Sequence, residues 1–457
     1  MFNAFVSWPT APVTKSLVLK ALEALNPTPA IVASPEGDHN LLWSTYDDID
    51  HELVHSHRES VLSSSYTFRK TLIRKHFLSR TLHAYVTKHP DSKLRNTSPR
   101  TFEIELSFVD ELEEMLLDEL WELGKELEDG ERWWILKPCV DISRLDFAFL
   151  RCASQVEWLT AGNGIRMFNS RAALEKIFEE FEDADSDDDG EDKSDGEEDQ
   201  TAVVTSQLRH FVIQEYLDNP LLFDPAEVLI NGSSKPDEPQ GFKFHLRAYC
   251  VAQGALKVFL FDKILALFSA VPYVKPSVEE DEDGDPLPVD LGPHLTNTSL
   301  QADRGEEGVR LFSELVSCQI LSGPHDPRAR FTTEDMKSII DQMTTILAET
   351  FKAALENPVH FQPLPNAFEL FGIDFLVTDS PGSQPRFQVS LLEINAEPAI
   401  ELTGPRLSWI LQDLFIAMGK VCVEPFFNPK TEELGWVVGE TRHGLIKCLE
   451  EQVRAHP

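Results

Sequence analysis

Hydrophobic residues follow two different periods along this chain. Apolar and polar residues alternate over 102–109, and short apolar runs recur elsewhere; both patterns predict β-strands, the runs at 133–137, 210–217, 242–251, 256–262, 371–377 and 386–395. Helical spacing marks 18–25 and the basic stretch 68–88. Because the two kinds of element interleave, we expect an α+β fold with antiparallel sheets.

Turn and capping residues support these elements. Gln253-Gly254 joins two predicted strands as a hairpin, and 380–385 closes a second hairpin. Thr332 followed three residues later by Asp335 is a helix-capping signature. The helix that it begins carries one apolar face, made of Met336, Ile340, Met343, Leu347 and Phe351.

Two acidic runs interrupt the pattern. Residues 179–199 hold 14 acids and one lysine, together with Ser186 and Ser194, and read as a disordered loop open to phosphorylation. Residues 277–293 add seven acids among prolines and glycines and read as a surface insertion. We expect an N-terminal domain of residues 1–100 and two lobes, 101–225 with the first run and 226–457 with the second.

Composition narrows the class of protein. The 457 residues are 42% hydrophobic, and 41 Lys and Arg against 77 Asp and Glu give a net charge of −36. This charge argues against nucleic acid or an anionic membrane as the main partner, and no apolar run is long enough to span a bilayer. The six cysteines show no zinc-ligand spacing, so we expect neither a zinc site nor a disulfide framework, and with no signal peptide we expect a cytoplasmic location.

Three oxygen-bearing side chains near the C-terminus form the first candidate site. Glu393 and Asn395 are two residues apart and share one face of a strand, and Asp374 lies on the preceding strand of the same hairpin. Carboxylate and amide oxygens without nitrogen or sulfur ligands suit Mg²⁺ that bridges nucleotide phosphates. The alternative is three polar residues that face solvent from an edge strand.

A basic set lies on other predicted strands. Lys137 ends one apolar strand, Gln214 lies near the end of another, and Lys243, His245 and Arg247 share one face of a third. Lysine and arginine bind phosphoryl oxygens, so this set suits a polyphosphate ligand. The alternative is an exposed strand face with ordinary salt bridges.

Several segments, read in order, resemble the tubulin–tyrosine ligase family of ATP-grasp enzymes: WWILKP, VIQEYLDNPLLF, KFHLRAY, HLTNTSLQ, FELFGIDFLV and LLEINAEPAIELTG. The resemblance runs from about Trp133 to the end, and the last segment is most similar to the fungal branch. It implies an ATP-grasp fold, in which two α+β lobes close over ATP and Mg²⁺ behind a small N-terminal α/β domain. The implied reaction phosphorylates a carboxylate, and an amine then attacks the acyl phosphate to give an amide bond.

The resemblance also implies a role for each candidate residue. Lys137 would hold the α- and β-phosphates, while Gln214 and the backbone of Tyr216 and Leu217 would contact adenine. Lys243 and Arg247 would lie along the nucleotide and the reacting phosphoryl group, with Asn297 near the γ-phosphate. The metal ligands would be Asp374, Glu393 and Asn395. Phosphoryl transfer needs positioning and charge neutralisation, which such a set supplies.

Three features depart from the family pattern. His245 stands where the animal enzymes have aspartate, and Asp262 where they have arginine. Residues 139–161 separate the strand lysine from Gly162-Asn163-Gly164-Ile165, which resembles the family's glycine-rich phosphate loop. This insertion is either a genuine apolar helix or a translated intron, and we favour the intron.

Two functional classes follow. The first is an ATP- and Mg²⁺-dependent ligase that modifies a protein, for which 68–88 offers a basic docking face for an acidic tail such as that of tubulin. The alternative for that stretch is an ordinary solvated helix face. The second class is a catalytically weak ATP-grasp scaffold in mRNA-processing bodies, as in some fungal relatives; Asp262 and the interrupted loop favour it.

Overall fold

The computed structural model contains three sheets and places most of the chain. The described residues are 2–35, 40–106, 108–139, 164–186, 210–230, 232, 234–278, 287–296, 307–323, 326, 328–398 and 400–453. The segment that separates Lys137 from the predicted glycine-rich loop therefore lies almost wholly outside them, as does Asn297. In the described part, no helix is long and apolar enough to cross a bilayer.

The N-terminal sheet is parallel, with strand order β2-β1-β3-β4. Its elements are β1 (Asn3–Ser7), α1 (Pro12–Glu23), β2 (Ala30–Val32), β3 (Asn40–Ser44), α2 (His51–Ser56) and β4 (Val61–Ser63). The prediction of antiparallel sheets is wrong here, because helical crossovers such as α1 return the chain to the same end of the sheet. The expected α/β character of this region is present.

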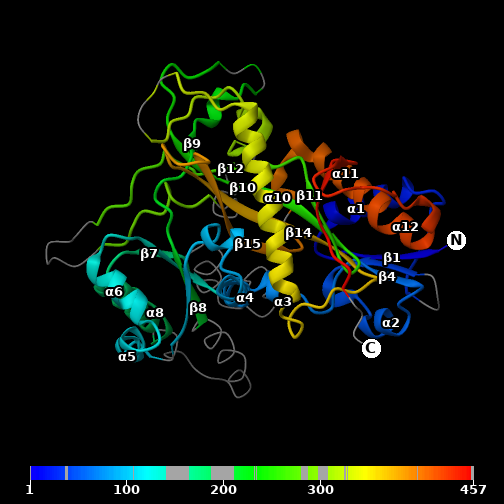
Figure 1. Cartoon of the computed structure of the whole chain (residues 1–457), viewed down its shortest axis with the longest axis horizontal. Coiled ribbons are helices and arrows are strands. Elements are labelled where there is room, and N and C mark those ends of the chain that lie inside the picture. The colour runs from blue at the N-terminus through cyan, green and yellow to red at the C-terminus, as the bar shows by residue number, and fades with distance from the viewer. Residues whose placement is uncertain are drawn as a thin grey trace.

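A helical segment leads from this sheet to the second one. It consists of α3 (Lys70–Ile73) and α4 (Lys75–Lys88), so the stretch 68–88 forms two helices, separated by an extended Arg74. Helix α4 buries Leu78, Leu82 and Tyr85 and lies beside the second sheet (Figure 1).

The second sheet is antiparallel, with strand order β5-β8-β6-β7. Its strands are β5 (Thr101–Glu105), β6 (Trp134–Pro138), β7 (Arg166–Phe168) and β8 (His210–Glu215). Three helices pack their apolar residues against it: α5 (Glu111–Leu117), α6 (Trp121–Asp129) and α8 (Arg171–Ser186).

The first acidic run begins in a helix, contrary to the prediction of a disordered loop, whereas the described residues of the second run are consistent with a surface insertion. Helix α8 continues to Ser186, and Phe181 stacks on Phe211 with the ring centroids 5.6 Å apart, because one apolar residue in the run suffices to anchor its first turns. At the end of the second run, Val289 and Leu291 pack against Tyr216. Residues 187–199 and 279–286 lie outside the described residues.

The third sheet has nine strands, and β10 (Phe242–Gln253) lies at its centre. Strand β10 pairs with β14 (Phe368–Asp379), which pairs with β15 (Phe387–Ala396). Both predicted hairpins, β10–β11 and β14–β15, are confirmed. The remaining strands are β9 (Leu222–Phe223), β11 (Lys257–Phe261), β12 (Leu265–Phe268), β13 (Val309–Leu311), β16 (Thr441–Arg442) and β17 (Leu445–Glu450).

Helices cover both faces of this sheet (Figure 1). One face packs against α10 (Thr333–Leu355), which begins with the predicted capping box at Thr332 and Asp335. The other packs against α1, α11 (Ser408–Met418), the π-helical turn Gly419–Val423 and α12 (Glu424–Phe427).

Alternation along β10 decides which side chains reach the candidate site. Leu246, Ala248 and Cys250 point into the α10 core, and Tyr249 and Val251 point into the α11 core. Lys243, His245 and Arg247 are in step with Tyr249 and therefore leave the sheet on the face away from α10.

Candidate functional site

The hairpin β14–β15 brings the three predicted metal ligands together. Asp374 pairs across the strands with Glu393, and Gly372 pairs with Asn395. The Asn395 amide nitrogen donates to Glu393 Oε1 at 3.1 Å and to Asp374 Oδ2 at 3.5 Å. Asp374 is only 3% exposed, so the alternative of polar residues that face solvent is wrong for it.

Asp374 is held by cations on the neighbouring strand. Arg247 donates from Nε to Oδ1 at 2.5 Å and from Nη2 to Oδ2 at 2.9 Å, and His245 Nε2 lies 3.5 Å from Oδ1. Burial acts to raise the pKa of Asp374, but attraction to Arg247 and His245 outweighs it and holds the pKa well below its usual range. The Asp374 carboxylate is therefore ionised.

His245 does not replace the family aspartate as an anion. Its Nδ1 lies 2.6 Å from the Thr296 hydroxyl, and its Nε2 faces Asp374. The side chain is 3% exposed. It thus places an imidazole ring next to the ionised carboxylate instead of a further negative charge.

Helix α4 supplies a residue that the sequence did not single out for the site. Lys75, the first residue of α4, places Nζ 3.5 Å from Glu393 Oε2. Burial acts to raise the pKa of Glu393, but attraction to Lys75 prevails and lowers it. In the sequence, Lys75 stands out only as part of the basic stretch 68–88. The charge of that stretch predicts a docking face and gives no sign of a contact with Glu393.

The docking-face prediction for 68–88 is wrong in part. Arg69 is 3% exposed and forms an ion pair with Glu369, and Lys75 points to Glu393. On the surface, Arg80 pairs with Glu103 at 2.6 Å and Lys88 pairs with Glu356 at 3.1 Å. Carboxylates from distant segments thus neutralise most of the basic charge.

Two lysines approach the site from different sheets. Lys137 of β6 donates to Gln214 Oε1 of β8 at 2.8 Å. Lys243 Nζ lies 4.1 Å from the centre of the Tyr216 ring, a cation–π contact, and the side chain is 6% exposed. Burial and repulsion from Lys137 lower the pKa of Lys243 to about 7. The pKa of Lys137 is also lowered by burial, although Glu393 opposes this.

Aromatic and apolar residues close one side of the lysine pair. The Tyr216 hydroxyl bonds to His294 Nδ1 at 2.9 Å, and the Tyr216 N–H donates to Trp133 O at 2.8 Å. Tyr216 packs with Ile135 and Met167, and Leu217 follows it as a partly buried residue outside any strand. Such a surface beside two lysines suits a ring that carries phosphates.

A small pocket opens to solvent between the second and third sheets. It is lined by Lys75, Leu78, Ser79, Leu82, Ser98, Thr101, Lys137, Val212, Gln214, Leu391 and Leu392. Helix α4 therefore forms one wall, and Leu391 and Leu392 extend towards the carboxylates of β15.

Gly372 is required where the chain passes close to the carboxylates. A Cβ atom at this position would lie 2.7 Å from Pro398 Cβ, which is closer than carbon atoms approach one another. Just before this proline, Glu397 adopts a φ of 48° and accepts a hydrogen bond from the Tyr46 N–H at 3.0 Å. The loop after β15 is thus packed tightly on the ligand-bearing strands.

Two antiparallel sheets that face one another across a cationic pocket and a carboxylate cluster define an ATP-grasp protein. The chain belongs to the tubulin–tyrosine ligase family, described as "Tubulin-tyrosine ligase family", whose pattern matches residues 153–431. The expectations for fold and family are confirmed.

Two fungal proteins and one solved structure are similar to the chain. It is 35% identical over 421 residues to "Probable tubulin--tyrosine ligase PBY1" of Saccharomyces cerevisiae, covering 89% of this chain and 48% of that protein. It is 34% identical over 410 residues to a probable tubulin–tyrosine ligase of Schizosaccharomyces pombe, covering 86% of this chain and 85% of that protein. The chain thus spans about half the length of the S. cerevisiae relative.

The solved structure is the C-terminal domain of K. lactis Pby1, described as an ATP-grasp enzyme that interacts with the mRNA decapping enzyme Dcp2. It has 28% sequence identity to the chain and a TM-score of 0.64, with 99% of this chain and 100% of that one covered.

The residues present fit ATP and Mg²⁺. Two ionised carboxylates and an amide offer the oxygen donors that Mg²⁺ prefers. Lys243, whose positive charge is disfavoured by burial, would be stabilised by a phosphate. The side chains of the site therefore have the chemistry that Mg²⁺ and a polyphosphate require.

Proposed function

We propose that this protein is an ATP- and Mg²⁺-dependent carboxylate–amine ligase of the tubulin–tyrosine ligase type, which adds an amino acid to a protein. The observation that carries the proposal is a pair of neighbouring buried lysines, Lys137 and Lys243, of which Lys137 is within electrostatic reach of the carboxylates of Asp374 and Glu393. A buried cation whose pKa has fallen to about 7 is poised for an anionic ligand. The carboxylates near Lys137 suit the metal that accompanies a polyphosphate.

In this proposal, each residue of the site has a separate role. Lys137 and Lys243 neutralise phosphate oxygens, and Gln214 with the backbone of Tyr216 and Leu217 contacts the base. Arg247 stabilises negative charge on the reacting group, and it can do so because it lies beside the carboxylates that hold the metal. Mg·ATP, when bound, supplies the phosphoryl group that activates the substrate carboxylate.

Three further assignments belong to this proposal. Asp374, Glu393 and Asn395 hold the magnesium ion, and Asn297 contacts the γ-phosphate. The protein acts in the cytoplasm, on an acceptor such as the tubulin C-terminal tail. Some basic residues of 68–88 already form the ion pairs described above. Only those outside these pairs, such as Lys70 and Arg74, would contact the acidic tail.

The nucleotide site is tested by thermal unfolding of the full chain. A ligand present at a hundred times its Kd stabilises the folded state by about 2.7 kcal/mol. We expect Mg·ATP to raise the melting temperature more than ATP with EDTA does. No change at millimolar Mg·ATP would refute the nucleotide site.

The ligase activity is tested by incorporation of labelled amino acids. Tubulin and its detyrosinated form, with labelled tyrosine or glutamate, are the first acceptors to assay. ATP-dependent incorporation supports the ligase. Nucleotide binding without incorporation into either acceptor would contradict a tubulin ligase.

A second candidate is a scaffold of the mRNA-processing machinery. The observation that favours it is the similarity to K. lactis Pby1, which is described as interacting with Dcp2. In addition, both oxygens of Asp374 are already bonded to Arg247, so a metal must compete for them. Co-purification of the decapping enzyme with both wild type and Glu393→Gln, without turnover in either, would favour this candidate.

A further inference from the structure

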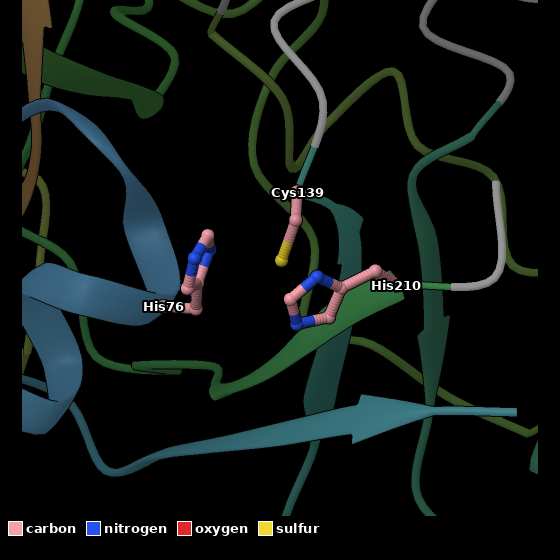
Figure 2. Close-up of side chains that lie close together, drawn as sticks. All are labelled: His76, Cys139 and His210. Atoms are coloured by element: carbon pink, nitrogen blue, oxygen red, sulfur yellow. The ribbon is translucent and has the colours of Figure 1, made fainter. Parts of the chain in front are cut away.

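Outside the proposed site, three side chains with metal-binding atoms face one another. His76 lies on α4, Cys139 directly follows β6, and His210 begins β8. Their ligand atoms all lie within 4.8 Å of one another. Figure 2 shows the Cys139 thiol between the two imidazole rings, with all three side chains turned towards a common space.

The backbone holds two of these residues in place. The Cys139 N–H donates to the His210 carbonyl oxygen at 2.9 Å, which continues the β6–β8 ladder. The thiol and the His210 ring therefore start from neighbouring positions in one sheet. Only His76 must be brought in by the packing of α4 on that sheet.

A carboxylate orients the His210 ring. His210 Nε2 lies 2.6 Å from Glu103 Oε1, which leaves Nδ1 available to a ligand on the other side. Metal-binding histidines usually donate their second ring N–H to a carboxylate in this way. Glu103 thus supplies a feature typical of a metal centre.

His76 adds an unpartnered buried atom. Among the described residues, its Nδ1 is buried without a hydrogen-bond partner. The ring contacts that of His210, with centroids 4.7 Å apart. An unsatisfied nitrogen beside a thiol and a second imidazole is costly in a bare protein core but useful to a metal ion.

We propose that His76, Cys139 and His210 bind a zinc ion. Two imidazoles and a thiolate are ligands for Zn²⁺ rather than for Mg²⁺, which prefers oxygen. Nitrogen and sulfur ligands of a tetrahedral zinc site lie roughly 3.3–3.6 Å apart, so atoms now within 4.8 Å of one another must approach by up to about 1.5 Å. Water or a substrate atom completes the coordination.

The zinc ion fixes α4 against the second sheet. His76 directly follows Lys75, which pairs with Glu393 at 3.5 Å. A metal bond to His76 therefore holds the N-terminus of α4 beside the carboxylate cluster. The zinc site rests on different residues from the proposed nucleotide site, so either one can fail alone.

The zinc site also bears on the segment 139–161. Cys139 is its first residue, so the zinc site and the intron interpretation exclude one another. A transcript that lacks the codon for Cys139 would overturn the zinc site. A transcript that contains the whole of 139–161 would show a genuine insertion that begins with a metal ligand.

The experiment loads the full chain, stripped with a chelator, with Zn²⁺ or Co²⁺ alone. We expect about one ion per chain, and for Co²⁺ the near-ultraviolet charge-transfer absorption of a thiolate ligand together with the intense visible bands of tetrahedral coordination. Cys139→Ser should abolish the charge-transfer band. His210→Asn should weaken binding, and Glu103→Gln should weaken it by about 10–100-fold.

Matched controls separate this site from other ligands in the chain. Cys318→Ser removes another buried cysteine, His89→Asn removes an exposed histidine at the end of α4, and Glu393→Gln alters the carboxylate cluster. All three should leave the cobalt spectrum unchanged. Circular dichroism establishes that each variant is folded, and Glu103→Gln keeps the test decisive if Cys139→Ser does not fold.

Two results would overturn the zinc site. One is a wild-type cobalt spectrum without thiolate absorption, which would place the ion at oxygen ligands only. The other is a thiolate band that persists in Cys139→Ser or disappears in Cys318→Ser.

Discussion

Strand β14 carries three buried carboxylates that are paired with arginine, Glu369, Asp374 and Asp379, and the first two differ in what surrounds them. Glu369 pairs with Arg69, accepts the Tyr66 N–H at 3.1 Å and is 2% exposed. The Arg69 guanidinium lies 4.2 Å from the centre of the Tyr46 ring, so this pair is enclosed by its own partners.

Asp374, five residues further along, pairs with Arg247 but has a second carboxylate as its neighbour. Glu393 lies opposite it across the hairpin, and Lys75 and Lys137 reach the same region from other elements. The first pair joins the N-terminal region to the third sheet. The second belongs to a cluster of two carboxylates and several cations from different elements, which is an arrangement that suits a charged ligand.

The largest expected effect is on the enclosed pair. Arg69→Met leaves Glu369 buried without its cation, and breaking a buried pair costs about 3–5 kcal/mol of unfolding free energy. Urea unfolding measures this loss. Adding Glu369→Leu should restore most of the stability, and failure of this rescue would show that Arg69 acts through other contacts.

The second prediction concerns the carboxylate cluster. Glu393→Gln removes a charge from the proposed metal ligands, and we expect ATP turnover to fall by more than the roughly 100-fold that marks the upper end of indirect effects. The protein should still fold, with a modest loss of stability, because attraction to Lys75 favours the charged form of Glu393 in the folded state. Labelled ATP turnover and circular dichroism measure the two quantities, and equal turnover in both proteins would remove this cluster from the reaction.

Lys243→Met should change binding and stability in opposite directions. Loss of a charge-assisted hydrogen bond to phosphate is worth about 1.5–3 kcal/mol, or roughly 10–100-fold in nucleotide affinity. The folded protein should become more stable at pH 7 and below, because a buried ammonium is removed. Calorimetric titration with Mg·ATP and urea unfolding test the two effects, and Lys70→Met, at an exposed position, is the control.

Burial of Lys243 should also make the stability of the folded protein depend on pH. The pKa of Lys243 is about 7 in the folded protein, against an ordinary value of 10.5. Between these values the unfolded chain binds more protons, so this group makes wild-type stability rise with pH. Below about pH 7 both states are charged and the cost of burial is complete. Lys243→Met should flatten this rise, and an unchanged slope would contradict the assigned pKa.

The smallest expected effect is the uptake of a proton. At pH 8 Lys243 is mostly neutral in the free protein, and a bound phosphate should charge it, with about 0.9 proton taken up at most. Calorimetric titrations in buffers of different ionisation enthalpy measure this uptake. Lys243→Met should show none, and uptake equal to the wild type would assign the proton to another group.

Local pattern determined a large part of this protein. Short apolar runs predicted β10, β14 and β15, the turn residues predicted their hairpins, and the Thr332 and Asp335 cap predicted the start of α10. The same pattern predicted that Asp374, Glu393 and Asn395 lie together, because residues two apart on a strand share a face and the two strands of a hairpin are neighbours. These features depend on interactions between residues that are close in sequence or joined by one turn.

Only the tertiary structure decided which distant segments meet. The charge pattern of 68–88 is the same whether its cations face solvent or Glu369 and Glu393, and the packing of α3 and α4 decides between the two. The cluster of His76, Cys139 and His210 has no motif spacing, since its ligands come from a helix and two strands. Such contacts depend on how helices and strands pack against one another. This packing is decided by side chains that lie far apart in the sequence, so a local pattern does not predict it.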